Sequence, residues 1–502
     1  METKDVISEL KKSLSAPMDG GSLAALDILK TVSTSTGLVA YDLQAPAKNL
    51  YPVLTPLRNM IPRVPGGVGV ATNWKQITSI VGSGYNAMGY VAEGQRTGRM
   101  SYTAVDKAAS YRTLGEEDQV TYEAISAGQT FEDVRATAAM RVLQKMMLKE
   151  ENALLGGNGS VLLGTPATPT LSAAGSGATL PTLTYSVIAV ALTFEGYLGA
   201  SLAGGVPTSQ VVTGADAQTY TLSGGSSQKS AAATQAVTLG QTLSCSTTAI
   251  NGAVAYAWFV GAAAAEKLEA ITTINSATFA LPLLGTGQAA TAITADNSRN
   301  ATLGFDGLLV QGATAGTLAT STRLATGTPG TGTVMTASGR GSINEIDTML
   351  QNMWDLYKIS PTQIWCNSQE LKNITAKVLT NASGPLLQYF KPAEGANEYR
   401  LAAGGRVDFY FNPYAIAGGQ KIPITVHPTL PPGTILLYCG DLPAQYQNNN
   451  VPNTFEVKVR RDYYQIDWPL RTRAQEFGVY AEEVLAVYAT FGIGILSNIA
   501  NG

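Results

Sequence analysis

The sequence predicts an α+β protein that carries one inserted all-β domain. A long amphipathic helix is expected over residues 130–156, and the elements after it lack the regular alternation of a parallel α/β fold. Residues 165–300 form a weakly charged, strand-rich segment. Their only charged side chains are Glu195, Asp216, Lys229, Glu266, Lys267, Glu269, Asp296 and Arg299. At 502 residues the chain has room for two or three domains.

The helix of residues 130–156 organises the rest of the chain. Thr130 is expected to be its N-cap, with Asp133 at the N3 position of a capping-box pattern, and Gly156 ends it. One face is apolar and predicts core contacts by Phe131, Val134, Ala138, Val142 and Leu148. Another face carries a basic row at intervals of four residues: Arg141, Lys145 and Lys149.

Residues 1–74 predict an extended arm, because prolines interrupt any continuous helix at Pro46, Pro52, Pro56, Pro62 and Pro65. An ordinary irregular N-terminal lobe is the alternative. Residues 74–81 and 99–115 have strand patterns around a turn-rich tip and predict a long hairpin over residues 75–115. So few large apolar side chains cannot stabilise a hairpin alone, so we expect another subunit beneath it.

The segment 165–300 predicts a β-sandwich. Strand-like runs at residues 184–194, 235–245, 253–261 and 272–281 are separated by turn signals. Cys245 precedes Trp258 by 13 positions, an arrangement similar to the immunoglobulin core, but a second cysteine for an inter-sheet disulfide is absent. We therefore expect an insert of immunoglobulin or fibronectin III type.

The remaining residues, 301–502, predict mixed helix and strand. Ser342 and Glu345 suggest a capping box at the start of a helix whose core-facing residues are Ile343, Ile346, Leu350, Met353 and Tyr357. A second helix is expected from Ser368 to Leu379, and strands are expected over residues 454–467 and 479–496. We expect this part of the chain to complete the α+β body.

Composition excludes several functional classes. A net charge of −3 leaves no global basic surface, so any contact with nucleic acid must come from a local face. Three widely spaced cysteines fit a reducing compartment, and neither a signal peptide nor a membrane-spanning apolar run is evident. We expect a soluble protein made in the cytosol.

The sequence also predicts that the protein is not an enzyme and binds no cofactor or metal. His427 is the only histidine, and a structural or solvated role is expected for it. Gly82–Ala87 matches a dinucleotide-binding glycine pattern, but the helix that would present its dipole does not follow. The neighbours Glu482 and Glu483 should point to opposite faces of one strand, which argues against an acid–base pair.

Taken in order, the arm, long hairpin, long helix, α+β body and closing strands resemble the major capsid proteins of tailed bacteriophages, whose fold is shared with herpesvirus capsid floors. The resemblance covers the chain outside the insert. It implies an N-terminal arm (1–74), an E-loop hairpin (75–115), a peripheral domain with its spine helix (116–164), the inserted sandwich (165–300), an axial domain (301–440) and the peripheral strands with the C-terminus (441–502).

The resemblance implies a structural function. Copies would assemble as pentamers and hexamers into an icosahedral shell that encloses double-stranded DNA, in the virion, after assembly in the host bacterial cytoplasm. Portal and scaffolding or decoration proteins would be partners, and no membrane is involved. The hairpin residues expected to contact neighbouring subunits are Lys75, Tyr90, Glu93, Arg96, Arg99 and Lys107, and those expected to face DNA are Arg141, Lys145 and Lys149.

Two properties of some family members are not expected here. A covalent Lys–Asn bond between hairpin and peripheral domain is unexpected, since residues 455–489 contain no Asn. Proteolytic removal of an N-terminal segment is also unexpected, because the sequence starts at Met1. The insert is expected to reach between capsomers or to lie on the outer surface. Two alternatives stay open: an encapsulin-type shell and a phage tail or adhesion protein.

Overall fold

The computed structural model describes residues 51–82, 88–129, 132–339, 341–380, 388–390, 400–402, 406–415, 418–442 and 453–502. The chain divides into two compact units, Met1–Tyr51 with Ala127–Glu132 and Pro52–Ser126 with Asp133–Gly502. The fold below is that of the second unit. Residues 1–50 of the predicted arm (1–74) and residues 83–87 of the glycine motif lie outside the described residues.

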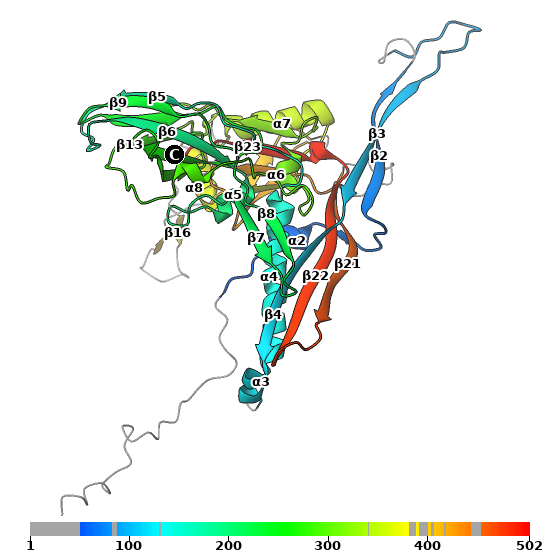
Figure 1. The fold of residues 1–502 in the computed structure, drawn as a ribbon. Coiled ribbons are helices and arrows are strands. Elements are labelled where there is room, and N and C mark those ends of the chain that lie inside the picture. The colour runs from blue at the N-terminus through cyan, green and yellow to red at the C-terminus, as the bar shows by residue number, and fades with distance from the viewer. Residues whose placement is uncertain are drawn as a thin grey trace, which may run out of the picture. The chain divides into compact units, whose positions relative to one another are not determined.

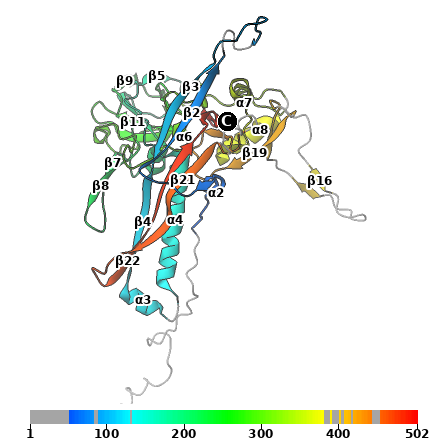
Figure 2. The same cartoon turned by 90° about the vertical axis from the view of Figure 1, so that its right-hand side faces the viewer.

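A four-stranded sheet and one long helix form the first layer pair of this unit. The strand order is β1-β21-β22-β4, with bounds Arg63–Val64, Phe455–Asp467, Ala474–Val487 and Arg112–Thr121. Helix α4 (Val134–Gly156) runs along this sheet (Figure 2). Their shared core consists of Val120, Ala138, Val142, Met146, Phe477, Val479 and Ala481. The core positions predicted at Ala138 and Val142 are thereby confirmed.

The predicted start of α4 is wrong in one respect. Asp133 is the N-cap, because its carboxylate accepts a hydrogen bond of 3.0 Å from the amide of Ala136. A carboxylate at this position also meets the positive end of the helix dipole, which favours capping by Asp133 itself. Thr130 and Phe131 lie outside the described residues. The predicted end at Gly156 is confirmed.

Strands β2 (Ala71–Val81) and β3 (Ser101–Ser110) form the predicted hairpin, which extends beyond the end of the four-stranded sheet (Figure 1). The predicted second arm, residues 99–115, does not belong to the hairpin throughout. After Tyr111 the chain continues as β4, which pairs with β22 from Arg112 to Thr121. The change of partner follows from burial, because Leu114 and Val120 of β4 pack against the α4 layer. Helix α2 (Pro56–Met60) precedes β1 and contacts α4, and helix α3 (Tyr122–Gly128) follows β4 directly.

The insert contains two facing sheets. One has the order β13-β10-β5 (Ser276–Phe279, Thr242–Ser246, Thr170–Ala174), and the other β12-β11-β6-β9 (Lys267–Thr272, Ala255–Gly261, Leu183–Leu192, Ala233–Val237). Cys245 and Trp258 are fully buried in the core between them. The all-β prediction agrees with this arrangement, while the immunoglobulin-type assignment stays a prediction.

The outer face of the second insert sheet is covered as well. Ile188, Val190 and Phe259 pack there against Val206 and Ile293, which lie outside the sheet. Burial on both faces explains why β6 has a continuous apolar run and no alternation. Helix α5 (Phe194–Gly199), the 3₁₀ turn η3 (Ala290–Ala292) and the hairpin β7–β8 (Ser209–Thr213, Thr219–Ser223) complete the segment.

Buried asparagines fasten the insert to the rest of the unit. The Asn158 side chain donates a hydrogen bond of 2.7 Å to the carbonyl of Ser298, which joins the two chain ends of the insert. The backbone amide of Asn275 donates to Oδ1 of Asn498 at 2.9 Å. The side-chain amide of Asn498 in turn donates to Oδ1 of Asn275 at 3.1 Å. The insert is therefore a fixed part of this unit and not a module on a loose tether.

A six-stranded sheet completes the fold, in the order β14-β23-β20-β15-β19-β18. Its strands are Thr320–Arg323, Ile493–Ser497, Ile435–Tyr438, Gln363–Cys366, Gln420–Val426 and Phe409–Asn412. β23 lies within the segment 441–502 that was predicted to be peripheral, but it pairs with β14 and β20 of this sheet. The remaining elements are α6 (Leu308–Gln311), η4 (Thr490–Gly492), β16 (Gln388–Phe390) and β17 (Arg400–Ala402).

Helices α7 (Asn344–Tyr357) and α8 (Ser368–Thr380) confirm the two helices predicted after the insert. The buried residues Ile343, Ile346, Leu350 and Met353 confirm the predicted core face. The predicted capping box is wrong, because Ile343 occupies the N-cap position. The Ser342 hydroxyl donates to the carbonyl of Ser338, and Glu345 accepts from the amide of Thr336 at 2.8 Å. Both side chains satisfy the preceding turn instead of the helix.

Candidate assembly surface

One face of the hairpin rests on the body at its base. The Trp74 ring meets the Tyr488 ring edge-on, with centroids 5.3 Å apart, and the Gln76 side chain donates to the Tyr488 carbonyl at 3.0 Å. Beyond Gln76 every residue of β2 is exposed. The half of the hairpin that is farther from the body, residues 77–82 and 88–105, is called the distal half below.

The distal half exposes large apolar side chains. Ile77, Ile80 and Tyr102 are 60%, 64% and 65% exposed. Tyr90, in the loop that ends the hairpin, is exposed almost completely. Soluble monomers seldom leave this much contiguous apolar surface in water, so the distal half has the character of an interface.

The structure places the other predicted contact residues of the hairpin as follows. Lys75 forms an exposed ion pair of 3.6 Å with Asp106. Lys107 pairs in register with Trp74 and therefore lies on the opposite face from Lys75. Glu93, Arg96 and Arg99 are exposed in the loop that ends the hairpin. The predicted contact residues are thus spread over both faces and the end loop.

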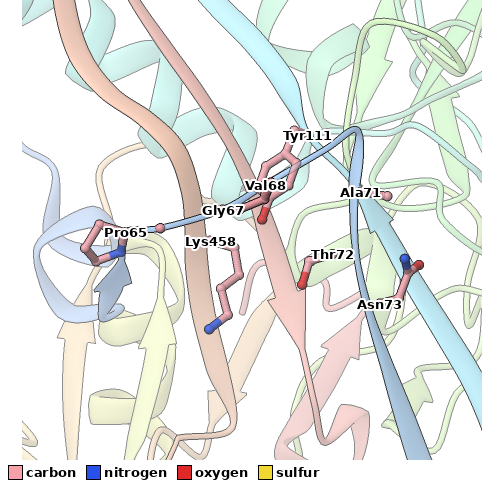
Figure 3. Close-up of a pocket in the computed structure, with 9 residues that line it drawn as sticks. Pro65, Gly67, Val68, Ala71, Thr72, Asn73, Tyr111 and Lys458 are labelled. Carbon is pink, nitrogen blue, oxygen red and sulfur yellow. The ribbon is translucent and has the colours of Figure 1, made fainter.

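A depression of about 300 Å³ lies at the base of the hairpin. Figure 3 shows Pro65, Gly67 and Val68 of the linker before β2 on one side, with Tyr111 and Lys458 beside them. Gly66 has a φ of +93°, which favours glycine, and at Gly67 the Tyr111 ring occupies the space that a Cβ would need. These two glycines therefore allow the linker to pass close to β21 and to Tyr111, the residue just before β4.

A group of charged and polar side chains around two buried glutamates holds the chain just before this linker. Glu150 of α4 is 1% exposed and contacts the Nε of Arg58 at 2.7 Å, an Nη of Arg63 and the hydroxyl of Tyr463. Arg63 also contacts Asp462 at 2.7 Å and Glu483 at 3.0 Å. We call this group, Arg58, Arg63, Glu150, Asp462, Tyr463 and Glu483, the anchor cluster.

Glu151 holds helix α2 on α4 by a second set of hydrogen bonds. Its carboxylate accepts hydrogen bonds from the amides of Leu57 at 2.9 Å and Arg58 at 2.7 Å. Helix α2 lacks a capping side chain of its own, so Glu151 satisfies amides that its first turn leaves free. His427 is buried and contacts Glu151 at 2.7 Å, so it has a structural and not a solvated role.

Glu483 is the most unusual member of the anchor cluster. Burial and the neighbouring Glu150 raise its pKa from 4.5 to about 8, although Arg63 opposes the shift. Glu482, the adjacent residue, points to the other face and pairs with Arg460. The opposite orientation predicted for these two glutamates is confirmed.

Sequence reasoning missed the anchor cluster, although one signal was present. Ala138, Val142, Met146, Glu150 and Leu154 follow one another at intervals of four residues, and all are buried. A carboxylate that continues an apolar stripe requires a cationic partner in the fold. Which cations would supply it was not visible, because Arg58 and Arg63 lie about 90 residues away in the chain.

The predicted basic row lies on the exposed side of α4. Arg141, Lys145 and Lys149 are exposed. Lys149 forms an ion pair with Glu116 of β4, and within the described ranges Arg141 and Lys145 make no ion pair. The structure therefore leaves two of the three predicted charges available to an anionic partner.

Two kinds of feature, metal-holding groups and membrane-spanning helices, are absent from the part of the chain that the structure describes. There, no group of three or more His, Cys, Asp or Glu side chains could hold a metal ion. Nor does any helix among those residues have the length and apolar character needed to cross a membrane. The surfaces that remain to be explained are the hairpin and the basic row.

No protein-family model and no curated protein sequence matches this chain. Among solved structures it is similar to the capsid of a native GTA particle, at 10% identity and a TM-score of 0.42, over 94% of this chain and 100% of that one. It is also similar to the capsid of Myoviridae phage XM1, at 8% identity and a TM-score of 0.39, over 96% and 100% of the two chains. An encapsulin complex from Synechococcus elongatus matches at 9% identity and a TM-score of 0.39, over 91% and 93%.

The resemblance to phage capsid proteins predicted from the sequence thus recurs among solved structures, together with the encapsulin alternative. TM-scores below 0.5 mark a distant similarity, so the function has to follow from the geometry of this chain itself.

Proposed function

We propose that this protein is a structural subunit that assembles with copies of itself into a closed shell. The observation that carries the proposal is the distal half of the hairpin. The hairpin extends beyond the end of the four-stranded sheet (Figure 1), and its distal half exposes Ile77, Ile80 and Tyr102. A two-stranded ribbon of this kind is marginal in water and gains stability only when a partner covers it. A contact of one copy's hairpin with a different surface of the next copy is heterologous, and such contacts form rings when the rotation from copy to copy closes on itself.

In its more specific form, the proposal is that pentamers and hexamers of this protein form an icosahedral shell around double-stranded DNA, in the virion of a tailed phage. Two features support it. The anchor cluster fixes the chain where it passes into the hairpin, so that the hairpin leaves from a rigid base. The basic row of α4 offers two exposed cations to phosphate groups. Portal, scaffolding and decoration proteins remain proposed partners.

Negative-stain electron microscopy of the protein expressed alone, with sedimentation velocity, tests the proposal. Hollow closed particles tens of nanometres across are expected. Slender trimers or fibres would contradict it and favour the tail or adhesion alternative. Particles that contain a protein cargo and no DNA when purified from a phage-producing host would favour the encapsulin-type shell.

Assembled particles are expected to be held together without covalent bonds. The hairpin carries Lys75 and Lys107, but Lys75 is engaged with Asp106 and residues 455–489 contain no Asn as an acceptor. Boiling purified particles in SDS should therefore release a single band near 52.4 kDa. A ladder of multimers that survives boiling would contradict this, and Lys75→Ala and Lys107→Ala would then locate the bond.

The double variant Arg141→Gln/Lys145→Gln is expected to weaken binding to double-stranded DNA. Each lost phosphate contact should lower the slope of log K against log salt by about 0.9. The loss should be the same for unrelated DNA sequences, because phosphate contacts carry no sequence information. Lys149→Gln is the matched control from the same row and should have the smaller effect, since Lys149 is paired with Glu116. Equal salt slopes for the double variant and the wild type would exclude this face.

A further inference from the structure

Three Asn–Gly pairs occur in the sequence, at residues 158–159, 251–252 and 501–502. Such a pair is chemically labile, because glycine has no Cβ to shield its backbone nitrogen from the side-chain carbon of the preceding asparagine. Attack of that nitrogen on the side chain expels ammonia. The reaction requires a free nitrogen and an accessible amide, and the surroundings of the three pairs differ in both respects.

The first pair is closed to this reaction. Asn158 is 1% exposed, and its side-chain amide donates to the carbonyls of Val161 at 2.8 Å and Ser298 at 2.7 Å. The backbone nitrogen of Gly159 donates to Oδ1 of Asp306 at 2.8 Å. Because both reacting groups are held in this way, Asn158 can react only when this region opens locally.

The second pair lies in a turn between β10 and β11. The amide of Ala253 donates to the carbonyl of Ile250 at 3.3 Å and closes the turn. Asn251 and Gly252 occupy its two central positions, and Asn251 is exposed. Gly252 has a φ of +85°, a conformation that favours glycine. Among the residues that the structure describes, the nitrogen of Gly252 has no hydrogen-bond acceptor, so it is free to act as a nucleophile.

Two groups outside the insert hold the side chain of Asn251. Its Nδ2 donates to the carbonyl of Ala313, shortly after α6, at 2.5 Å. Its Oδ1 accepts a hydrogen bond of 3.3 Å from one Nη of Arg323 in β14. The other Nη of Arg323 donates to the carbonyl of Ala249 at 3.3 Å, which fixes the guanidinium against the same turn. This arrangement exists only while the insert is docked on the sheet that contains β14.

The guanidinium is placed to promote the attack. When the Gly252 nitrogen adds to Cγ of Asn251, negative charge develops on Oδ1, and Arg323 already donates a hydrogen bond to that oxygen. The hydrogen bond from Nδ2 to Ala313 keeps the side chain in one orientation, so Oδ1 stays beside Arg323. The fold therefore supplies a free nucleophile and a polarised amide at the same turn.

We propose that Asn251 is a self-modification site, at which the folded chain converts asparagine to aspartate or isoaspartate with the help of Arg323. A bond forms between the Gly252 nitrogen and Cγ of Asn251, and the bond from Cγ to Nδ2 breaks. The amide proton of Gly252 leaves with Nδ2 as ammonia. Water then opens the cyclic imide at either of its two carbonyl groups. The inference goes beyond the proposed function and does not depend on it.

The modification changes how the insert is fastened. A carboxylate cannot donate a hydrogen bond, so the bond to the Ala313 carbonyl is lost and two acceptor oxygens face each other. The new negative charge lies beside Arg323 and pairs with it. Isoaspartate also lengthens the main chain of the turn. The attachment of the β10–β11 turn therefore moves from Ala313 towards Arg323.

Ageing the full-length protein in mildly alkaline buffer, followed by mass spectrometry of its peptides, tests the site. Asn251 is the only asparagine in the tryptic peptide 230–267, and fragment ions separate it from the glutamines there. Asn501, which is exposed, is the internal reference. Asn251 should react at least as fast as Asn501, and Asn158 at least about tenfold more slowly, since it must await local opening. Slower reaction of Asn251 than of Asn501 would overturn the proposal.

Arg323→Met separates activation from exposure alone. The rate at Asn251 should fall by about threefold or more, a smaller effect than in a buried oxyanion site because water reaches this turn. Arg406→Met is the matched control, since Arg406 lies near the opposite edge of the same sheet and pairs with Asp408. Slow reaction of Asn158 in the same samples verifies that each variant is folded.

Denaturant provides the second comparison. In concentrated guanidinium chloride, Asn251 should react equally fast in Arg323→Met and the wild type, because the contact with Oδ1 exists only in the fold. Equal rates at Asn251 in the two folded proteins, or a difference that persists in denaturant, would overturn the proposal.

Asn251→Asp reproduces the aspartate product and tests its effect on the fastening. Hydrogen exchange of the backbone amides of residues 249–254 should be faster than in the wild type, because the hydrogen bond to Ala313 is lost. Asn501→Asp introduces the same charge at the exposed reference pair and should leave this exchange unchanged. Identical exchange of Asn251→Asp and the wild type would overturn the link between the modification and the fastening.

Discussion

Replacing Arg63 by Met is expected to lower the free energy of unfolding of the unassembled subunit by about 3–5 kcal/mol. Arg63 contacts Glu150, Asp462 and Glu483, and the two glutamates are almost fully buried. Removing the guanidinium takes one of its two cationic partners from Glu150, a carboxylate that is only 1% exposed. Met fills a similar volume, so the loss would report the charge rather than a cavity.

Chemical denaturation followed by tryptophan fluorescence measures the effect of Arg63→Met. Arg461→Met is the matched control on the same strand pair, because Arg461 is exposed and stacks on Tyr464; a change below about 1 kcal/mol is expected for it. Equal stability of Arg63→Met and the wild type would mean that the anchor cluster does not stabilise the fold.

Arg63→Met should also impair assembly. β1 has only two residues, and it pairs with β21 at Arg63 and Val64 immediately before the hairpin linker. Losing the anchor would free the base from which the hairpin leaves and would increase the conformational entropy lost on docking. A lower assembled fraction than that of the wild type, at the same protein concentration, is the expected result in sedimentation velocity.

Glu483→Gln is expected to flatten the pH dependence of stability between about pH 5 and pH 8. The pKa of Glu483 is raised from 4.5 to about 8 by burial and by Glu150, so the folded state holds a proton that the unfolded state has released. Its contribution is fully present below pH 4.5 and is lost as the pH rises through 8. At up to about 1.4 kcal/mol per pH unit, the wild type should lose up to about 4 kcal/mol more than Glu483→Gln across this window.

Denaturation curves at several pH values measure this difference. Glu482→Gln is the matched control, because Glu482 is adjacent in sequence but lies on the other face, paired with Arg460. It should leave the slope between pH 5 and pH 8 unchanged. Parallel pH profiles of the wild type and Glu483→Gln would show that the carboxyl of Glu483 is ionised throughout.

Periodic patterns made much of the fold predictable. The apolar stripe around Ala138 and Val142 indicated α4, and the stripe from Ile343 to Met353 indicated α7. These patterns are local consequences of helix geometry, so they can be seen without knowing the partner. Caps were less predictable, because short polar side chains have several backbone groups within reach: the Ser342 hydroxyl donates to the Ser338 carbonyl, whereas the Asp133 carboxylate accepts from the Ala136 amide.

The candidate assembly surface likewise has features that local sequence patterns predict and features that depend on contacts between distant segments. The sequence determined that a long hairpin with exposed charges precedes a long helix with a basic row, since both follow from residue type and spacing. Only the tertiary structure decided that Arg58 and Arg63 meet Glu150, and that Lys149 is occupied by Glu116. It also decided that Thr78 bulges and turns Ile80 outward beside Ile77. Ion pairs between distant segments and strand register depend on which surfaces pack together, and a single stretch of sequence does not encode that choice.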